Sequence, residues 1–315
     1  MIEEFKNDVD KGLKSSPKTL PSKYFYDKKG SELFVQIMHL PEYYLTRAEY
    51  EIFKKQTKSI IKALQLNVDS YFELIELGPG NGLKTKELLH LLDMEKYKFD
   101  YFPIDISQNA LNKLEETINN ELPNVSIKKK QGDYFQVLKS LKDSHHHKVI
   151  LFLGSNIGNM SDEVASNFIY KLGANLSTND KLLLGVDLIK SESIVRPAYD
   201  DSKGITREFN LNLLKRINCE LGADFEVDKF SHHAEYSEKE GIARSYLVSS
   251  IDQKVSIKKI GKTYNFAKGE NILTEISRKY NDETINKIIS NTDFKVTKKL
   301  TDSKKYFSNY VLTRS

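Results

Sequence analysis

Cysteine is nearly missing from this sequence: Cys219 is the single one among 315 residues. One cysteine cannot form an internal disulfide, and no Cys/His spacing resembles a structural zinc site. A reducing compartment is therefore expected, and we predict a cytoplasmic protein. With 39% hydrophobic residues, a chain of this length buries enough apolar surface to fold without such staples, as one large or two modest domains.

Long apolar segments are missing too. No uninterrupted apolar run approaches the ~20 residues that span a bilayer, and the first residues, MIEEFKNDVDKGLKSS, lack the apolar centre of a signal peptide. A large charge excess is also missing, because 48 basic and 44 acidic residues are mostly interspersed and leave a net charge of +4. This mild field predicts neither a membrane nor a nucleic acid as partner.

Two short polar runs need a separate interpretation. The lysines at 128–130 are expected to form a solvated strand end, with a phosphate-binding patch as the alternative. The histidines at 145–147 lie in a polar segment, and three consecutive imidazoles do not converge readily on a metal ion. We therefore expect these histidines to be exposed to solvent and predict no metal site.

From residue 71 on, short apolar runs alternate with segments of helical length, which is typical of a parallel sheet built from βα units. The predicted strands are residues 72–77, 99–104, 125–129, 149–153 and 181–187, and the clearest helical segments are 84–92, 107–120 and 161–176. Right-handed crossovers between them give an open, doubly wound α/β sheet with helices on both faces. Two alternating stretches at 294–300 and 306–313 predict a terminal antiparallel hairpin that closes the sheet edge.

The regular pattern breaks after Asp187. A Pro-containing loop is expected at 194–199, a long helix at about 204–221, and strand-like segments at 244–250 and 253–259. A helix near 283–290 then leads into the terminal hairpin. We expect the interrupted region to form a separate, smaller α+β domain. No internal repeat or low-complexity linker marks its limits.

A glycine-rich loop, Glu76-Leu77-Gly78-Pro79-Gly80-Asn81-Gly82, directly follows the first predicted strand and precedes a helix. Glycines let the backbone bend sharply and approach a ligand at the carboxyl end of a parallel strand, where open α/β sheets bind cofactors. Pro79 and the lack of a following Lys-Ser/Thr pair do not fit a P-loop, which argues against a nucleoside triphosphate. The candidate cofactors that remain are a dinucleotide and S-adenosylmethionine.

Two acidic residues at strand ends narrow this choice. Asp105 lies 105 − 82 = 23 residues after Gly82, where a carboxylate can accept both ribose hydroxyl hydrogens. Asp133 follows the third strand and suits an adenine amino group, and Glu76 stands just before the glycines. This set favours S-adenosylmethionine. The alternative is that Asp105 and Asp133 cap helices and bind nothing.

Six ordered blocks stand out along nearly the whole chain. They are KYFYD at 23–27 with GSELF at 30–34, LPEYYLTR at 40–47, IELGPG at 75–80, FLGSNIGN at 152–159, AYDD at 198–201 and TEIS at 274–277. These blocks resemble the histidine-specific Nα-methyltransferases, which use S-adenosylmethionine to make trimethylhistidine (hercynine) in ergothioneine biosynthesis. The resemblance implies an enzyme that adds methyl groups to the α-amino nitrogen of L-histidine.

The same resemblance implies a division of the chain and a set of site residues. Residues 54–190 and 280–315 would form the cofactor domain, and residues 1–53 and 191–279 the substrate domain. The family's cofactor contacts correspond to Tyr43, Gly78, Lys84, Asp105, Asp133 and Tyr134. Its amino-acid site corresponds to Tyr26, Tyr43, Gly154, Asn159, Tyr199, Glu275 and Ser277.

The chemistry of these residue types agrees with that substrate. Asn159 and Tyr199 are neutral donors suited to a carboxylate, while Glu275 and Ser277 can bind the two ring nitrogens of an imidazole. Two residues at this spacing share a face only on an extended segment, so we predict extended backbone there. The alternative is an amphipathic helix over 271–280 that carries Glu275 on its surface.

Catalysis should consist mainly of positioning an unprotonated amine against the sulfonium methyl group. No strong base is required, because desolvation and the nearby positive charge favour loss of the ammonium proton. Tyr26 is the candidate for orienting the amine, directly or through water. We expect a monomer.

One departure from the family concerns the substrate. Where the family usually has a methionine-type residue in a strand lining the pocket, this chain has Ser245. A smaller, polar residue facing the ligand would make the pocket roomier or wetter. The alternative function is therefore a methyltransferase of the same family acting on another amino acid or a histidine-like amine, such as a tryptophan derivative. A regulator that only binds the cofactor, or a nucleic-acid methyltransferase, is the rival from another class.

Overall fold

The computed structural model describes residues 2–142 and 144–315, which divide into two compact units. The seven-strand unit comprises Leu45–Ile189 and Lys279–Ser315, and the four-strand unit comprises the chain up to Tyr44 together with Lys190–Arg278. Two of the expected domain limits lie one residue from these breaks, whereas the expected limit after residue 53 falls inside α3 (Leu45–Ala63), a helix with a kink at Gln56. The assignment of cofactor and substrate to separate domains stays a prediction.

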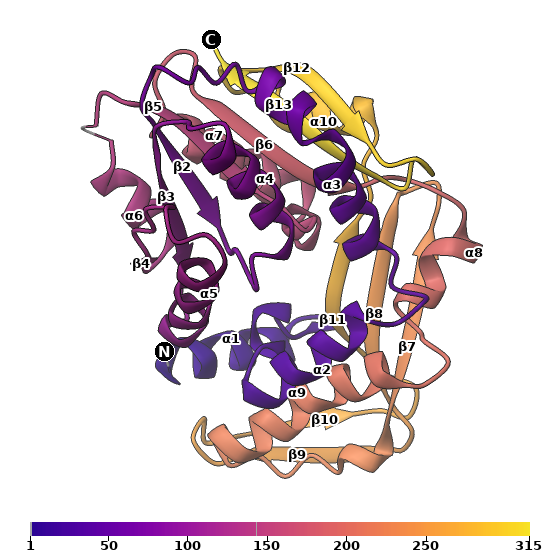
Figure 1. Cartoon of the computed structure of the whole chain (residues 1–315). Helices are drawn as coiled ribbons and strands as arrows, with labels where there is room; N and C mark the ends of the chain where they lie inside the picture. Colours follow the sequence, from indigo (N-terminus) through magenta and orange to yellow (C-terminus); the bar gives the residue numbers. More distant parts are fainter. Residues whose placement is uncertain (1, 143) are drawn as a thin grey trace. The chain divides into compact units, whose positions relative to one another are not determined.

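The sheet of the seven-strand unit has the order β12-β13-β6-β5-β2-β3-β4 (Figure 1). Its strands are β2 (Phe72–Leu77), β3 (Phe99–Asp105), β4 (Lys130–Gln131), β5 (His147–Phe152), β6 (Lys181–Asp187), β12 (Phe294–Thr301) and β13 (Phe307–Arg314). The strands from β2 to β6 are parallel, while β13 is antiparallel to both β6 and β12. The predicted doubly wound sheet with a terminal antiparallel hairpin is confirmed.

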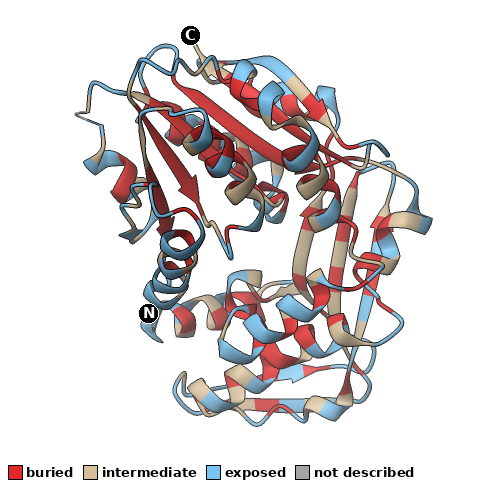
Figure 2. Cartoon of the chain, viewed as in Figure 1, coloured by how far each residue is buried: buried red, intermediate tan, exposed pale blue. Residues whose placement is uncertain are grey.

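Helices cover both faces of this sheet. Phe72 and Leu74 of β2 belong to the core beneath one set of helices, and Ile75 and Leu77 to the core beneath the other. The first set is α3, α4 (Leu83–Met94) and α5 (Gln108–Glu121), and the second is α6 (Tyr134–Ser140), α7 (Asp162–Gly173) and α10 (Asp282–Ile289). Because both faces are covered, β2 and β6 are buried along their whole length (Figure 2), which explains their continuous apolar sequences.

The edge of the sheet differs from the prediction. The strand expected at 125–129 is reduced to a single bridge between Ile127 and Tyr101, and the regular strand β4 covers only Lys130–Gln131. Lys128 and Lys129 form ion pairs with Asp100 and Glu115 at the surface. Edge strands are often short and lysine-rich, since a long edge invites pairing with other chains.

The four-strand unit holds a sheet of order β1-β11-β8-β7 and a separate two-stranded ribbon. The sheet strands are β1 (Lys18–Thr19), β7 (Phe230–Ser237), β8 (Ile242–Ser249) and β11 (Asn271–Arg278), and the ribbon is β9 (Gln253–Ile257) with β10 (Lys262–Phe266). Its longer helices are α1 (Ile2–Lys14), α2 (Lys28–Met38) and α9 (Ile205–Leu221). Apolar side chains of these helices share one core with Leu247 of β8 and Ile272 of β11.

The expected loop at 194–199 is wrong. This segment continues a short helix, α8 (Glu192–Val195), and then forms the 3-10 helix η3 (Arg196–Ala198). Proline is compatible with this backbone because Pro197 lies in the first turn of η3, where no backbone donor is required.

The chain leaves and re-enters the seven-strand unit at neighbouring points. The backbone N–H of Tyr280 donates to the carbonyl of Asp187 (2.8 Å), and that of Ile189 donates to the carbonyl of Tyr280 (2.9 Å). Beside them, the ammonium of Lys279 lies 2.8 Å from the Asp187 carboxylate, and both side chains are fully buried.

Within the described residues, no helix combines the length and apolar character needed to cross a membrane.

Candidate active site

The glycine loop connects β2 to α4 in a backbone conformation that suits glycine. Gly78, Gly80 and Gly82 all have positive φ, between 58° and 67°. A Cβ on Gly78 would lie 2.7 Å from the Tyr134 hydroxyl oxygen, so a larger residue would displace Tyr134 and strain the backbone. At Gly80, in contrast, no described heavy atom lies within 4 Å of that position. The loop thus leaves open space next to exposed backbone, which fits the close approach of a cofactor.

Glu76 has a structural role that the sequence did not reveal. Its buried carboxylate accepts hydrogen bonds from the hydroxyls of Thr85 (2.7 Å) and Tyr101 (2.5 Å). Burial raises the pKa of Glu76, although these two hydrogen bonds oppose the shift. The residue therefore fixes the strand before the glycine loop to α4 and β3.

Asp105 and Asp133 lie where the sequence predicted, at the carboxyl edge of the sheet. Asp105 ends β3, its Oδ1 accepts from the backbone N–H of Ser107 (2.8 Å), and burial raises its pKa. Asp133 caps α6, with Oδ1 accepting from the N–H groups of Phe135 (2.9 Å) and Gln136 (3.3 Å). Asp133 therefore caps a helix, as the alternative expected, while its ligand binding stays a prediction. Capping does not exclude ligand binding, because each carboxylate also has a second oxygen.

Tyr134 completes this group. It begins α6 directly after Asp133, and its hydroxyl lies beside Gly78. Burial, together with the negative charges of Asp105 and Asp133, raises the pKa of Tyr134 to about 12. Its hydroxyl is therefore a neutral hydrogen-bond donor at ordinary pH. The structure brings together four predicted cofactor residues: Gly78, Asp105, Asp133 and Tyr134.

Lys84 and Gly154 are joined by a residue that the sequence reasoning missed. The buried carboxylate of Glu49, on α3, accepts from the Lys84 ammonium (2.5 Å) and from the Gly154 backbone N–H (2.9 Å). The Asn156 side chain is a second missed residue, since it lies within 4 Å of the positions that a Cβ would take at Gly78 and at Gly154. Asn159 ends the short helix η2 (Asn156–Asn159) that follows.

The four-strand unit carries the second group of predicted residues. Glu275 and Ser277 lie on β11, paired with Ser245 and Ala243 of β8. The extended backbone predicted for them is confirmed, and the helical alternative for 271–280 is wrong. The register shifts between Leu273 and Glu275, which marks a bulge just before this pair.

Hydroxyl groups lie near Glu275, the acidic residue of this group. The Tyr199 hydroxyl donates to Ser277 Oγ (2.7 Å), and the hydroxyl of fully buried Ser245 donates to Glu275 Oε2 (3.4 Å). Ser245 therefore lies on the same side of the sheet as Glu275, as the departure from the family pattern suggested. The result is a carboxylate that accepts from one neutral donor, Ser245, with the Ser277 hydroxyl on the same strand face; this arrangement suits a ring that carries N–H groups.

Tyr26 and Tyr43 belong to a cluster of aromatic rings in the four-strand unit. The Tyr26 ring packs edge-on against Phe34 (5.4 Å between centroids) and Phe209 (5.7 Å), and Phe34 packs against Tyr43 (6.1 Å). Desolvation of its hydroxyl, then the nearby Glu275 and Tyr199, raises the pKa of Tyr26 above its usual value of 10. Tyr26 consequently keeps its proton at neutral pH, although the residue as a whole is 46% exposed.

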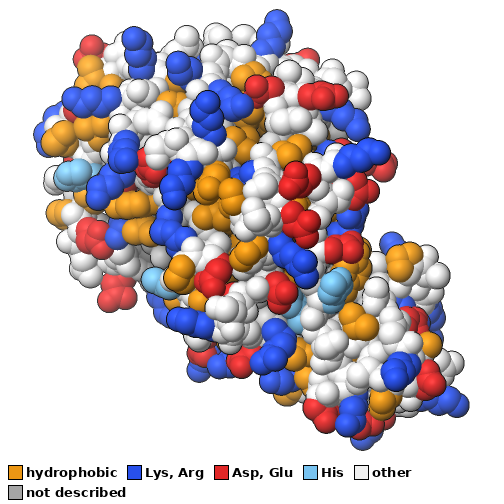
Figure 3. Space-filling view, turned by 90° about the vertical axis from the view of Figure 1, so that its right-hand side faces the viewer, with side chains coloured by type: hydrophobic (Ala, Val, Ile, Leu, Met, Phe, Trp, Pro, Cys, Tyr) orange, Lys and Arg blue, Asp and Glu red, His pale blue; other side chains and the backbone are white. Residues whose placement is uncertain are grey.

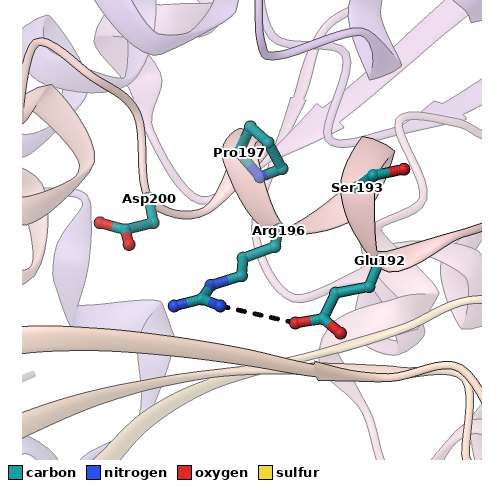
Figure 4. A pocket seen from close by; sticks show the side chains of 5 residues that line it. All are labelled: Glu192, Ser193, Arg196, Pro197 and Asp200. Carbon is teal, nitrogen blue, oxygen red and sulfur yellow. Dashed lines mark ion pairs between the residues drawn. The ribbon is translucent and has the colours of Figure 1, made fainter.

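An open surface pocket on the four-strand unit contains none of the predicted site residues. Glu192, Ser193, Arg196, Pro197 and Asp200 line it (Figure 4). Its Arg196 guanidinium lies 3.6 Å from the Glu192 carboxylate, and both side chains are 49% exposed. Such an exposed pair contributes little to stability or to ligand binding.

The histidine run and the surface charges offer no second site. His145 and His146 are exposed as predicted, and His147 is half-buried with Nδ1 3.3 Å from Asp180. The described residues contain no cluster of three potential metal ligands. On the face shown in Figure 3, basic and acidic side chains are mixed rather than separated into broad patches.

The doubly wound sheet with its terminal hairpin, and a glycine loop facing two carboxylates at the carboxyl edge, define a methyltransferase that uses S-adenosylmethionine. The family model for histidine-specific, S-adenosylmethionine-dependent methyltransferases matches residues 5–314. The chain is 36% identical over 283 residues to the histidine N-alpha-methyltransferase of Mycolicibacterium smegmatis, covering 90% of this chain and 86% of that protein. It is 37% identical over 280 residues to that of Mycobacterium tuberculosis, covering 89% and 85%.

A fungal relative is similar over part of its length. Ergothioneine biosynthesis protein 1 of Schizosaccharomyces pombe is 32% identical over 304 residues, which covers 94% of this chain and 39% of that protein. The chain therefore belongs to the family of histidine-specific, S-adenosylmethionine-dependent methyltransferases. The family resemblance, the enzyme class and the choice of S-adenosylmethionine over a dinucleotide are confirmed.

Proposed function

We propose that this enzyme transfers methyl groups from S-adenosylmethionine to the α-amino nitrogen of L-histidine and forms Nα,Nα,Nα-trimethylhistidine (hercynine) for ergothioneine-type biosynthesis. The observation that carries the proposal is the placement of Glu275 and Ser277 on one face of β11, framed by Ser245 and Tyr199. The half-buried carboxylate of Glu275, together with the Ser277 hydroxyl, can bind both ring nitrogens of an imidazole. A phenyl ring would leave the same polar atoms unpaired.

The remaining predicted residues have complementary roles in this proposal. Asn159 and Tyr199 bind the substrate carboxylate, Gly154 and Tyr43 complete the amino-acid site, and Tyr26 orients the amine. In the structure the Tyr199 proton is directed at Ser277. When a carboxylate binds, Tyr199 turns this proton to the ligand, and the Ser277 hydroxyl becomes available to the imidazole.

The cofactor residues are Gly78, Lys84, Asp105, Asp133 and Tyr134, with Tyr43. Bound there, S-adenosylmethionine supplies an electrophilic methyl group next to a positive sulfonium. The site residues would hold the amine against that methyl group. Desolvation and the positive sulfonium favour the neutral amine, whose proton passes to solvent water, so no strong base is needed. The raised pKa of Tyr26 fits this scheme, because a protonated hydroxyl orients the nitrogen lone pair but does not remove a proton.

The direct test is to incubate the purified protein with S-adenosylmethionine and each amino acid separately, followed by mass spectrometry. We expect histidine to gain one to three methyl groups and the other amino acids to gain none. Methylation of a different amine alone would reject the proposal. Tight cofactor binding without any methyl transfer would indicate a regulator instead.

Tyr26→Phe tests the orienting role. We expect kcat to fall about ten- to hundredfold, with a smaller change in KM for histidine. Because the pKa of Tyr26 lies above its usual value, the hydroxyl stays protonated between about pH 6 and 9, and the loss should be the same throughout that range. The measurement is a pH–rate profile, with Tyr246→Phe on the outer face of β8 as control. A shifted alkaline limb in Tyr26→Phe would show that Tyr26 ionises during the reaction.

A second candidate substrate, a histidine-like amine such as a tryptophan derivative, is favoured by one observation. Ser245 is fully buried beside Glu275, and it is smaller than the methionine-type residue expected there. Competition between histidine and such amines in the same assay decides between them. A monomer located in the cytoplasm remains our prediction, and light scattering after gel filtration measures the oligomeric state.

A further inference from the structure

We propose that Glu49 is a positioning residue that aims the Lys84 ammonium at the carboxylate of the cofactor and holds the Gly154 loop in place. The proposal rests on the assignment of Lys84 to the cofactor site. Glu49 lies on α3, outside the glycine loop and outside every sequence block that carries the family resemblance.

The contacts of Glu49 hold its side chain in one orientation. Its side chain is 1% exposed, and both carboxylate oxygens are hydrogen-bonded. Oε2 accepts from Lys84 and from the Gly154 N–H, while Oε1 accepts from the Asn309 amide on β13 (3.1 Å). A buried carboxylate is costly unless each oxygen is satisfied, so its orientation is tightly fixed.

The neighbouring strands are shaped around this carboxylate. Gly185 of β6 pairs in register with Asn309, and a Cβ on Gly185 would collide with Oε1 of Glu49. Only glycine leaves room there. Gly154 also favours glycine, because its φ is +75°, a backbone conformation that other residues rarely adopt. Two glycines thus allow one acidic side chain to reach the end of the sheet.

The Glu49 carboxylate lies at the topological switch point of the sheet, where the order of successive strands reverses direction. Lys84 follows β2 and Gly154 follows β5, and these two strands are adjacent and parallel. The chain runs outward from β2 to β3 and β4 and then returns to β5 on the other side. Doubly wound sheets bind ligands at the carboxyl ends of the two strands that flank such a point. Glu49 therefore connects both walls of the expected cofactor crevice.

The chemistry of Lys84 indicates which part of the cofactor is involved. An ammonium has three donors, and Glu49 accepts one of them. The Lys84 side chain is 20% exposed and the Glu49 side chain 1%, so of this pair only Lys84 can be reached by a ligand. The cofactor has a single anionic group, the carboxylate of its amino-acid part. A lysine held by a buried acid presents its remaining donors to that group in a fixed direction.

The test compares two ligands that differ in this carboxylate. S-adenosylhomocysteine carries it, and 5′-methylthioadenosine lacks the amino-acid part. For Glu49→Gln, calorimetry should show about ten- to hundredfold weaker binding of S-adenosylhomocysteine and an unchanged affinity for 5′-methylthioadenosine, within about twofold. Glu51→Gln is the matched control, because Glu51 lies on the same helix and pairs with Lys55 instead. It should bind both ligands as the unaltered protein does.

Two further variants separate the possible outcomes. Lys84→Met should likewise weaken binding of S-adenosylhomocysteine but not of 5′-methylthioadenosine. Glu49→Gln combined with Lys84→Met should bind S-adenosylhomocysteine no worse than Lys84→Met alone. Equal weakening of both ligands by Glu49→Gln, or no weakening, overturns the proposal. If Lys84→Met leaves binding of S-adenosylhomocysteine unchanged, the assignment of Lys84 itself fails. Should Glu49→Gln not fold, Glu49→Asp, which keeps the charge but retracts it by one methylene, must show the same selective loss.

Discussion

Glu275→Ala is expected to lower kcat/KM for histidine by about 10²- to 10³-fold and to leave the affinity for S-adenosylmethionine unchanged within about twofold. The reason lies in the framing of this carboxylate: the Ser245 hydroxyl donates to it, and Ser277 lies beside it on the same face of β11. Without Glu275, a ring N–H of the substrate and the Ser245 hydroxyl both lose their acceptor. Steady-state kinetics with histidine, together with calorimetry of the cofactor, measure the two parts of the prediction.

Two variants control for this result. Glu275→Gln keeps the size and an acceptor oxygen but removes the charge, and its loss should be intermediate. Glu235→Ala removes a carboxylate from the exposed face of β7, where it bonds Tyr246, and should leave kcat/KM within about twofold of normal. Equal losses in histidine use and cofactor affinity for Glu275→Ala would show that the division of roles between the residues is wrong.

Lys279→Met should lower the free energy of unfolding by about 3–5 kcal/mol. Lys279 and Asp187 are both fully buried, with 2.8 Å between ammonium and carboxylate, so the substitution removes a cation from the immediate surroundings of a buried carboxylate. Urea unfolding followed by circular dichroism measures the effect. The exposed pair of Lys55 and Glu51 provides the comparison, and Lys55→Met should cost less than about 1 kcal/mol.

A second substitution shows whether the charge is responsible. Adding Asp187→Asn to Lys279→Met also removes the buried carboxylate charge and should restore part of the lost stability. If Lys279→Met and Lys55→Met cost the same, the buried pair contributes no more than a surface one, and its burial has no energetic consequence.

The central strands could be predicted nearly to the residue, because a strand covered on both faces must be apolar at almost every position. At the edge this signal fades, and the lysine-rich segment at 125–129 keeps only one bridge to Tyr101. The backbone of Glu275 and Ser277 was predictable for another reason. The family resemblance assigns both residues to one ligand, and two residues at this spacing can face one ligand only from an extended segment, which β11 provides. Without that resemblance, the sequence pattern at 271–280 favours an amphipathic helix.

Glu49 was missed because nothing near it in the sequence points to its partners. Lys84, Gly154 and Asn309 are 35, 105 and 260 residues away along the chain. One signal was present: Glu49 lies on the same helical face as the buried residues Leu45, Ile52 and Phe53. A charged residue within an apolar stripe requires a buried partner, and that requirement is a reason to look for one.

The sequence of the seven-strand unit is interrupted at one place, although its sheet is complete. The segment Lys190–Arg278 starts after Ile189 and ends before Lys279, and hydrogen bonds between Tyr280 and the end of β6 hold these two points together. A segment whose ends are so close can be replaced by one of different length without changing the strand order. Since β1 pairs with β11, however, a functional graft must exchange the N-terminal segment together with the insertion. If the four-strand unit binds the substrate, as we predict, exchanging these two pieces of chain changes the substrate specificity and leaves the methyltransferase sheet unaltered.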